Sequence, residues 1–204
     1  MTRYAFAVLS AAFVLSTSSL AAQTPAASST RGFFIGAHLN GSAIAIEDAE
    51  FGEDEQSGGG AGLQLGYGFT ERLALFIEGT AAGLEDEVVL AHADFGIRYS
   101  FTGPTRRWVP SVEAALTGRG LARDDADLEG GGTGDVSLTG GGFTLGVGLQ
   151  YYTAPNWAIG IAAKWTGGEF TTFEVDNVSV DGFEIDATST LFNIGLTWYP
   201  QAGR

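Results

Sequence analysis

The sequence predicts an all-β fold, a closed antiparallel up-and-down barrel of about eight strands. From Phe33 onward, apolar residues recur at every second position in segments of up to about ten residues. This is the period of a strand with two different faces. Short and long connections alternate between the segments, and aromatic residues gather at the segment ends beside the short connections.

The first residues differ from the rest of the chain and predict a signal peptide at residues 1–22. Arg3 supplies a positive charge, residues 4–15 are mostly apolar, and residues 16–22 are mostly small. A spanning helix needs about 20 apolar residues, so this run is too short to cross a bilayer. A buried N-terminal helix is the alternative. The remaining predicted divisions are a mature N-terminal tail at 23–32, a barrel domain at 33–200 and a C-terminal tail at 201–204.

Composition excludes several classes of protein. Asp and Glu number 24 against 10 Lys and Arg, which argues against binding to nucleic acid, because phosphates require a basic surface. The chain has no Cys, so it has neither a disulfide framework nor a cysteine for lipid attachment. After residue 22, Gly or polar residues interrupt every apolar run before it reaches the length of a spanning helix.

The alternation defines the expected strands in order along the chain. In residues 60–69, for example, Leu63, Leu65 and Tyr67 alternate with Gly62, Gln64 and Gly66. The other segments show the same contrast between an apolar and a small or polar face. The expected strands are 33–40, 60–69, 73–78, 91–101, 108–117, 143–151, 157–166 and 192–199.

The connections predict which end of the barrel is which. Residues 70–72, 102–107 and 153–156 are short, and the latter two contain Pro, as turns often do. Residues 41–59, 83–89, 118–141 and 167–189 are mostly long, Gly-rich and acidic, and we expect them to be loops. This layout is typical of bacterial outer-membrane barrels, whose turns face the periplasm and whose loops face outside.

The distribution of large and small residues predicts that the apolar face contacts lipid. Alternation alone also fits a soluble sandwich or a lipocalin-like barrel. However, the polar face is rich in Gly, Ala, Ser and Thr, which suit the narrow interior of an eight-stranded barrel. Aromatic rings also favour the membrane interface. We predict an interfacial aromatic girdle of Phe33, Phe69, Phe101, Trp108, Tyr151, Trp157 and Trp198.

These features resemble the small outer-membrane β-barrel family, of the OmpX-, OmpA- and OmpW-like kind, across about residues 33–200. The last segment, from Leu191 to Tyr199, is similar to the C-terminal signal that the barrel-assembly machinery of this family recognises. It departs from the family pattern because residues 200–204 follow it in place of a terminal aromatic. The resemblance implies periplasmic termini and an outer-membrane location.

Ionisable residues on the polar face predict an ion network inside the lumen, because buried charges must pair. We expect Arg98 to bridge two of the carboxylates, and Lys164 to pair with one of the others or share one of these. His38, Gln64, His92 and Asn193 lie nearby in the pattern. The network is expected to plug the lumen; a proton or solute path is the alternative. Its predicted members are Glu78, Asp94, Arg98, Glu113 and Lys164, with Glu78 and Glu113 as the expected partners of Arg98.

The chain offers no recognisable catalytic or metal site, and no cofactor is expected. Both histidines, His38 and His92, fall on the lumen face, and spacing assembles no Ser–His pair there. Asp125 opens a segment like a calcium-binding EF-hand loop, but Val136 stands where a Glu ligand is needed. We therefore expect solvated acidic loops. Divalent ions bridging them to lipopolysaccharide phosphates are the alternative. The acidic residues are Glu47, Asp48, Glu50, Glu53, Asp54, Glu55, Asp124, Asp125, Asp127, Glu129 and Asp135.

Taken together, the sequence predicts an integral outer-membrane barrel with a structural or surface-interaction role. A narrow channel for small or apolar solutes is the second hypothesis, and an enzyme acting on lipid the third. The expected partners are outer-membrane lipid, lipopolysaccharide and the barrel-assembly machinery during biogenesis. The sequence leaves the oligomeric state open.

Overall fold

The computed structural model describes residues 30–48, 52–85, 88–102, 107–127, 133–175 and 178–200. The predicted signal peptide at 1–22, residues 23–29 of the predicted tail and the C-terminal tail at 201–204 lie outside the described residues. So do Glu50 and Glu129 of the predicted acidic loops. Within the described ranges, no helix is long and apolar enough to cross a membrane.

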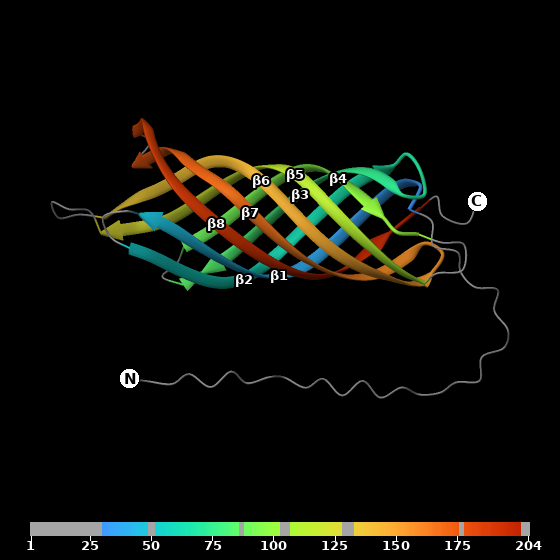
Figure 1. Cartoon of the computed structure of the whole chain (residues 1–204). Helices are drawn as coiled ribbons and strands as arrows, with labels where there is room; N and C mark the ends of the chain where they lie inside the picture. The colour runs from blue at the N-terminus through green and yellow to red at the C-terminus, as the bar shows by residue number, and fades with distance from the viewer. Residues whose placement is uncertain are drawn as a thin grey trace.

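Eight antiparallel strands follow one another around a closed barrel, and β8 pairs with β1 to complete it (Figure 1). Ile35 faces Trp198 across this last seam, so β1 begins and β8 ends at the same end of the barrel. The predicted fold class is confirmed. The strands are β1 (Gly32–Asp48), β2 (Gly52–Gly68), β3 (Leu73–Leu84), β4 (Val88–Ser100), β5 (Trp108–Asp127), β6 (Thr133–Ala154), β7 (Trp157–Val175) and β8 (Val178–Trp198).

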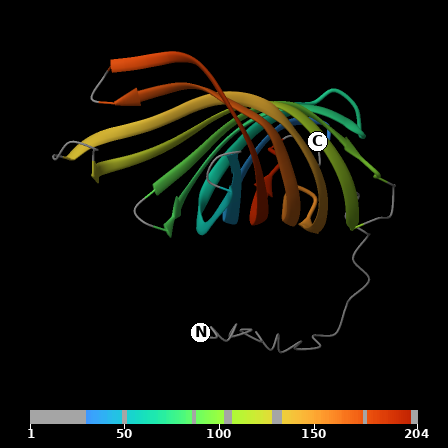
Figure 2. The ribbon, with the colours of Figure 1, turned by 60° about the vertical axis from the view of Figure 1, so that its left-hand side comes forward.

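The long acidic loops predicted at 41–59, 83–89, 118–141 and 167–189 are wrong, because the strands continue through most of these residues. Gly41 pairs with Gly59, and Gly118 pairs with Gly141. Backbone ladders continue wherever partners are present, but Gly and small polar residues carry little hydropathy contrast to reveal them. Figure 2 shows the β5–β6 and β7–β8 hairpins reaching furthest at this end. We call it the long-strand end, and the opposite end, with the β2–β3, β4–β5 and β6–β7 connections, the turn end.

The outward face of the barrel carries a continuous apolar belt. Leu63 is 65% exposed and Leu116 is 72% exposed, although both are large apolar side chains. On β7 the belt runs from Trp157 to Trp165, which is about the 9–11 residues that a tilted transmembrane strand requires. Because β7 has 19 residues, its remainder extends past the belt.

The predicted girdle residues all lie on this outward face, near the turn end. Several are paired: Phe33 contacts Tyr67 edge to face, Trp108 lies against Tyr151, and Trp157 stacks on Trp198. Phe69 and Phe101 are exposed in the same way. At the other edge of the belt, Phe143 packs against Trp165, so aromatic pairs stand at both of its edges.

The interior is closed by two apolar clusters. The turn-end plug consists of Phe34, Ala74, Phe76, Val109, Tyr152, Ala158 and Tyr199. The long-strand plug consists of Ile44, Leu90, Phe170 and Ala187, with Ile46, Leu84, Leu121, Leu138 and Ile185 packed against it and partly buried. Polar side chains occupy the lumen between the two plugs.

Candidate functional site

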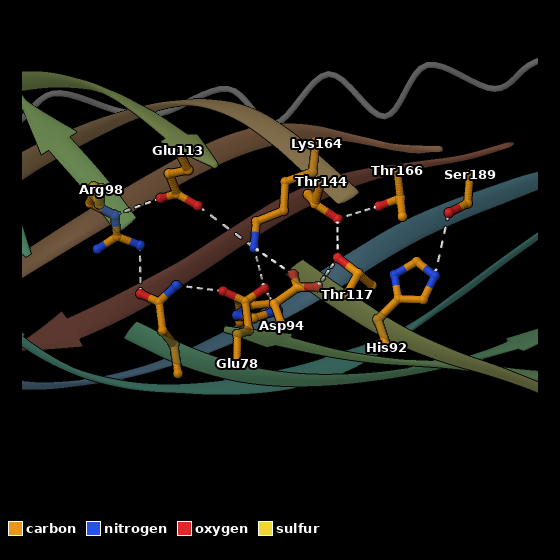
Figure 3. A network of polar contacts seen from close by, with 12 residues as sticks. Glu78, His92, Asp94, Arg98, Glu113, Thr117, Thr144, Lys164, Thr166 and Ser189 are labelled. Carbon is orange, nitrogen blue, oxygen red and sulfur yellow. Dashed lines mark hydrogen bonds and ion pairs between the residues drawn. The ribbon is translucent and has the colours of Figure 1, made fainter. Parts of the chain in front are cut away.

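The polar centre of the lumen is built by strands whose inward positions carry charge. Glu78 on β3, Asp94 on β4, Glu113 on β5 and Lys164 on β7 are each at most 8% exposed. Arg98 on β4 is 7% exposed. Strand pairing sets Glu78 beside Asp94, and Arg98 beside Glu113, so neighbouring strands bring these groups to similar depths. Figure 3 shows the resulting network.

Lys164 is the centre of the network. Its Nζ lies 2.6 Å from Glu78 Oε1, 3.5 Å from Asp94 Oδ2 and 3.7 Å from Glu113 Oε2. It is the sole lysine of the chain, and its side chain is 3% exposed. One ammonium group therefore joins three carboxylates that come from three different strands.

Arg98 makes a different set of contacts from those predicted. Its Nε donates to Glu113 Oε1, and its Nη2 donates to Gln64 Oε1 at 2.6 Å. Gln64 in turn donates to Glu78 Oε2. The prediction that Arg98 bridges Glu78 and Glu113 directly is wrong, because Gln64 stands between Arg98 and Glu78. The bridging role belongs to Lys164.

Aromatic rings of the turn-end plug cover the cations of the network. The Arg98 guanidinium lies 5.3 Å from the Phe34 ring centroid and 5.5 Å from that of Phe76. Lys164 Nζ also lies 5.5 Å from the Phe76 centroid. Cations are attracted to the faces of such rings, so the plug and the network stabilise each other.

Above the ion network, three threonines form a chain of hydroxyl contacts. Thr117 Oγ1 donates to Asp94 Oδ1 at 2.7 Å, and it lies 2.6 Å from the Thr144 hydroxyl. Thr144 in turn lies 2.6 Å from the Thr166 hydroxyl. These residues come from β5, β6 and β7, so the chain ties three neighbouring walls of the barrel to the carboxylates.

A small cavity of about 60 Å³ lies beside the network. Four of its lining residues each have a buried polar atom without a partner among the described residues: His38 Nε2, Arg98 Nη1, Glu113 Oε2 and Asn193 Oδ1. Glycines such as Gly36, Gly148 and Gly160 form part of its wall. A polar cavity of this size has room for a few water molecules, and these would satisfy the four atoms.

Sequence reasoning missed two features of the lumen. One is Arg119, because residues 118–141 were expected to be a loop. The other is a Ser–His contact, in which Ser189 Oγ lies 3.3 Å from His92 Nε2 although the residues are 97 positions apart. Both side chains are buried, and the pair lies beyond the threonine chain in Figure 3. Face parity places both residues inside, but it does not give the depth at which they meet.

Within the described ranges, no three His, Asp or Glu side chains come close enough together to hold a metal ion. The side chains of Glu47, Asp48, Glu53, Asp54, Glu55, Asp124, Asp125 and Asp127 lie outside the described part of the structure, although their backbones belong to strands. Asp135, on β6, is exposed.

Comparison with known proteins relates this architecture to outer-membrane barrels. The chain is similar to the crystal structure of Neisserial surface protein A, with a TM-score of 0.58 and 17% identity over 82% of this chain and 96% of that one. It is also similar to outer membrane protein AlkL in lipid bilayers (TM-score 0.56, 14% identity, 90% and 96% covered). A third similar structure is OprG of Pseudomonas aeruginosa (TM-score 0.55, 9% identity, 84% and 97% covered). At these identities the likeness concerns the fold alone.

No curated protein matches the chain by sequence. A family model does match, the outer membrane protein beta-barrel domain, and it spans residues 12–198. This family points to the bacterial outer membrane and agrees with the apolar belt. The chain therefore belongs to the outer membrane protein beta-barrel domain family.

Proposed function

We propose that this protein is a closed outer-membrane barrel with a structural or surface-interaction role, and that it does not conduct solutes. The observation that carries this proposal is the filled lumen. A solute moving along the axis meets the long-strand plug, then the threonine chain and the ion network, and finally the turn-end plug. Phe34, Phe170, Tyr152 and Tyr199 are each at most 1% exposed, so neither plug leaves a wide opening beside its large rings.

The same proposal includes an orientation in which the turn end faces the periplasm and the long-strand end faces outside. It is supported by the strands that extend past the belt at one end only, where exposed acids such as Asp135, Glu169 and Asp186 gather. In this orientation the belt would contact outer-membrane lipid and lipopolysaccharide. The acidic strand ends would form the surface available to other partners.

Because the chain has no Cys, single-cysteine variants test the orientation in whole cells. Thr139 is exposed on β6 towards the long-strand end, and Thr153 is exposed on the same strand at the turn end. A membrane-impermeant maleimide should label Thr139→Cys and spare Thr153→Cys until the outer membrane is permeabilised. The reverse pattern would contradict the proposed orientation.

A narrow channel is the second candidate, and the glycine-lined cavity beside the network favours it. The Arg98→Ala variant separates the two candidates. In a closed barrel the variant leaves Glu113 without its closest cation, so thermal stability should fall while the current across planar bilayers stays at background. A clear rise in conductance would favour the channel.

The buried Ser189–His92 pair does not support hydrolysis of lipid, since the two side chains are 1% and 5% exposed and lie inside the barrel wall. We infer that the protein is not an enzyme. Incubation of the purified barrel with lipopolysaccharide should release no fatty acid. Release that disappears on His92→Ala would overturn this inference.

A further inference from the structure

Arg119 on β5 is a buried cation held in a fixed position between the polar lumen and the long-strand plug. The residue is 4% exposed. Its Nη1 donates to the Ala187 carbonyl on β8 at 2.9 Å, and its Cζ lies 4.6 Å from the ring centroid of Phe170 on β7. Contacts to two other strands thus orient the guanidinium.

One edge of this guanidinium is unpartnered. Arg119 Nε and Nη2 are both buried, and neither has a hydrogen-bond partner among the described residues. In a planar guanidinium these two atoms point their hydrogens from the same edge, which is a fork that matches a carboxylate. The same edge of Arg98 holds Glu113 and Gln64.

The charge of Arg119 is also unmatched at short range. Lys164 and Arg98 each contact a carboxylate, but in the described part of the chain no carboxylate lies within ion-pair distance of Arg119. An isolated buried charge is costly unless it is paired. The edge therefore favours an anion over a neutral ligand.

The surroundings of Arg119 are polar on one side and apolar on the other. His92 is its neighbour across the β4–β5 pairing, and His92 contacts Ser189. On the other side, the long-strand plug presents Leu121 and Leu138, which are only partly buried. A carboxylate at Arg119 would place an attached apolar group beside these side chains.

We propose that the free edge of Arg119 binds the carboxylate of a small apolar molecule, which enters from the long-strand end and stops above the ion network. This site goes beyond the structural role proposed above, since a barrel that is closed to passage can still hold a ligand at one end. The bidentate fork selects the carboxylate, and the apolar plug selects the substituent.

Octanoate is the probe, titrated calorimetrically into the full chain in lipid nanodiscs with the heat of empty nanodiscs subtracted. Octanoate should bind saturably with one site per barrel. 1-Octanol has a similar apolar chain without the carboxylate, and acetate has the carboxylate without the chain; both should bind at least about tenfold more weakly. Arg119→Lys keeps the charge but loses the fork, so octanoate affinity should also fall at least about tenfold.

Arg123→Lys is the matched control, because Arg123 is exposed four positions further along the same strand and should leave octanoate affinity unchanged. The proposal is overturned if Arg119→Lys binds octanoate as the parent does, or if Arg123→Lys causes an equal loss. It is equally overturned if 1-octanol or acetate binds as tightly as octanoate. These ligand comparisons use the unmodified protein, so the test does not depend on the folding of any variant.

Discussion

Replacing Lys164 with Met tests whether the ion network stabilises the barrel. Methionine keeps an unbranched side chain of similar length but removes the ammonium that lies 2.6 Å from Glu78 and within 3.7 Å of Asp94 and Glu113. Three buried carboxylates then share one contacting cation, Arg98. Removal of one partner from a buried ion pair typically costs about 3–5 kcal/mol, so the free energy of unfolding should fall by about that amount.

The assay is equilibrium unfolding of the refolded protein in lipid vesicles, followed by tryptophan fluorescence. Glu78→Gln in the Lys164→Met background removes one unmatched carboxylate, so the double variant should be more stable than the two single effects predict, by at least about 1 kcal/mol. Lys164→Arg, which keeps the charge, should lose less stability than Lys164→Met. A loss below about 1 kcal/mol for Lys164→Met, together with additive effects in the double variant, would refute the reasoning.

Further predictions concern the wall, the threonine chain, the burial of the lysine and the belt. A Cβ at Gly96 would lie 2.6 Å from the Ala115 Cβ, whereas one at Gly79 meets nothing within 4 Å, so Gly96→Ala should lose about 1–3 kcal/mol in the same unfolding assay while Gly79→Ala stays within about 0.5 kcal/mol; equal effects would contradict the packing. Thr144→Val removes the hydroxyl between Thr117 and Thr166 and should cost about 1–2 kcal/mol, and no change would show that these contacts contribute little. An amine-reactive ester should leave Lys164 unmodified in the folded barrel and modify it after unfolding, as peptide mass analysis would reveal; rapid modification of the folded protein would contradict its burial. In single-tryptophan variants, brominated lipids should quench Trp157 and Trp165 most strongly when the bromines lie near the headgroups, and strongest quenching at the bilayer centre would place the belt wrongly.

Much of this fold could be predicted because a barrel wall has one periodicity. Leu63, Leu65 and Tyr67 alternate with Gly62, Gln64 and Gly66, and the structure points the first set outwards. The same parity places Glu78, Asp94, Glu113 and Lys164 inside. What fails is the length of the strands, since segments such as residues 56–60 contain Gly, Gln and Ser and show no hydropathy alternation although their backbones pair.

Parity also gives the face of a residue without giving its partner across the lumen. Lys164 reaches Glu78, which is 86 positions away, because β7 and β3 bring the two side chains to one depth across the interior. The inward aromatics Phe34, Phe76, Tyr152 and Tyr199 occupy lumen-face positions near the turn end, and that is the signal which could have indicated the turn-end plug. Arg119 was missed because its segment was expected to be a loop.

Single-channel recording of the purified, refolded barrel in planar bilayers tests the closed lumen most directly. The two plugs and the ion network between them predict no discrete current steps for the unmodified protein across a range of applied voltages. The controls are empty bilayers and a known porin refolded in the same way. Reproducible steps of uniform size, scaling with the number of inserted barrels, would contradict the closed lumen.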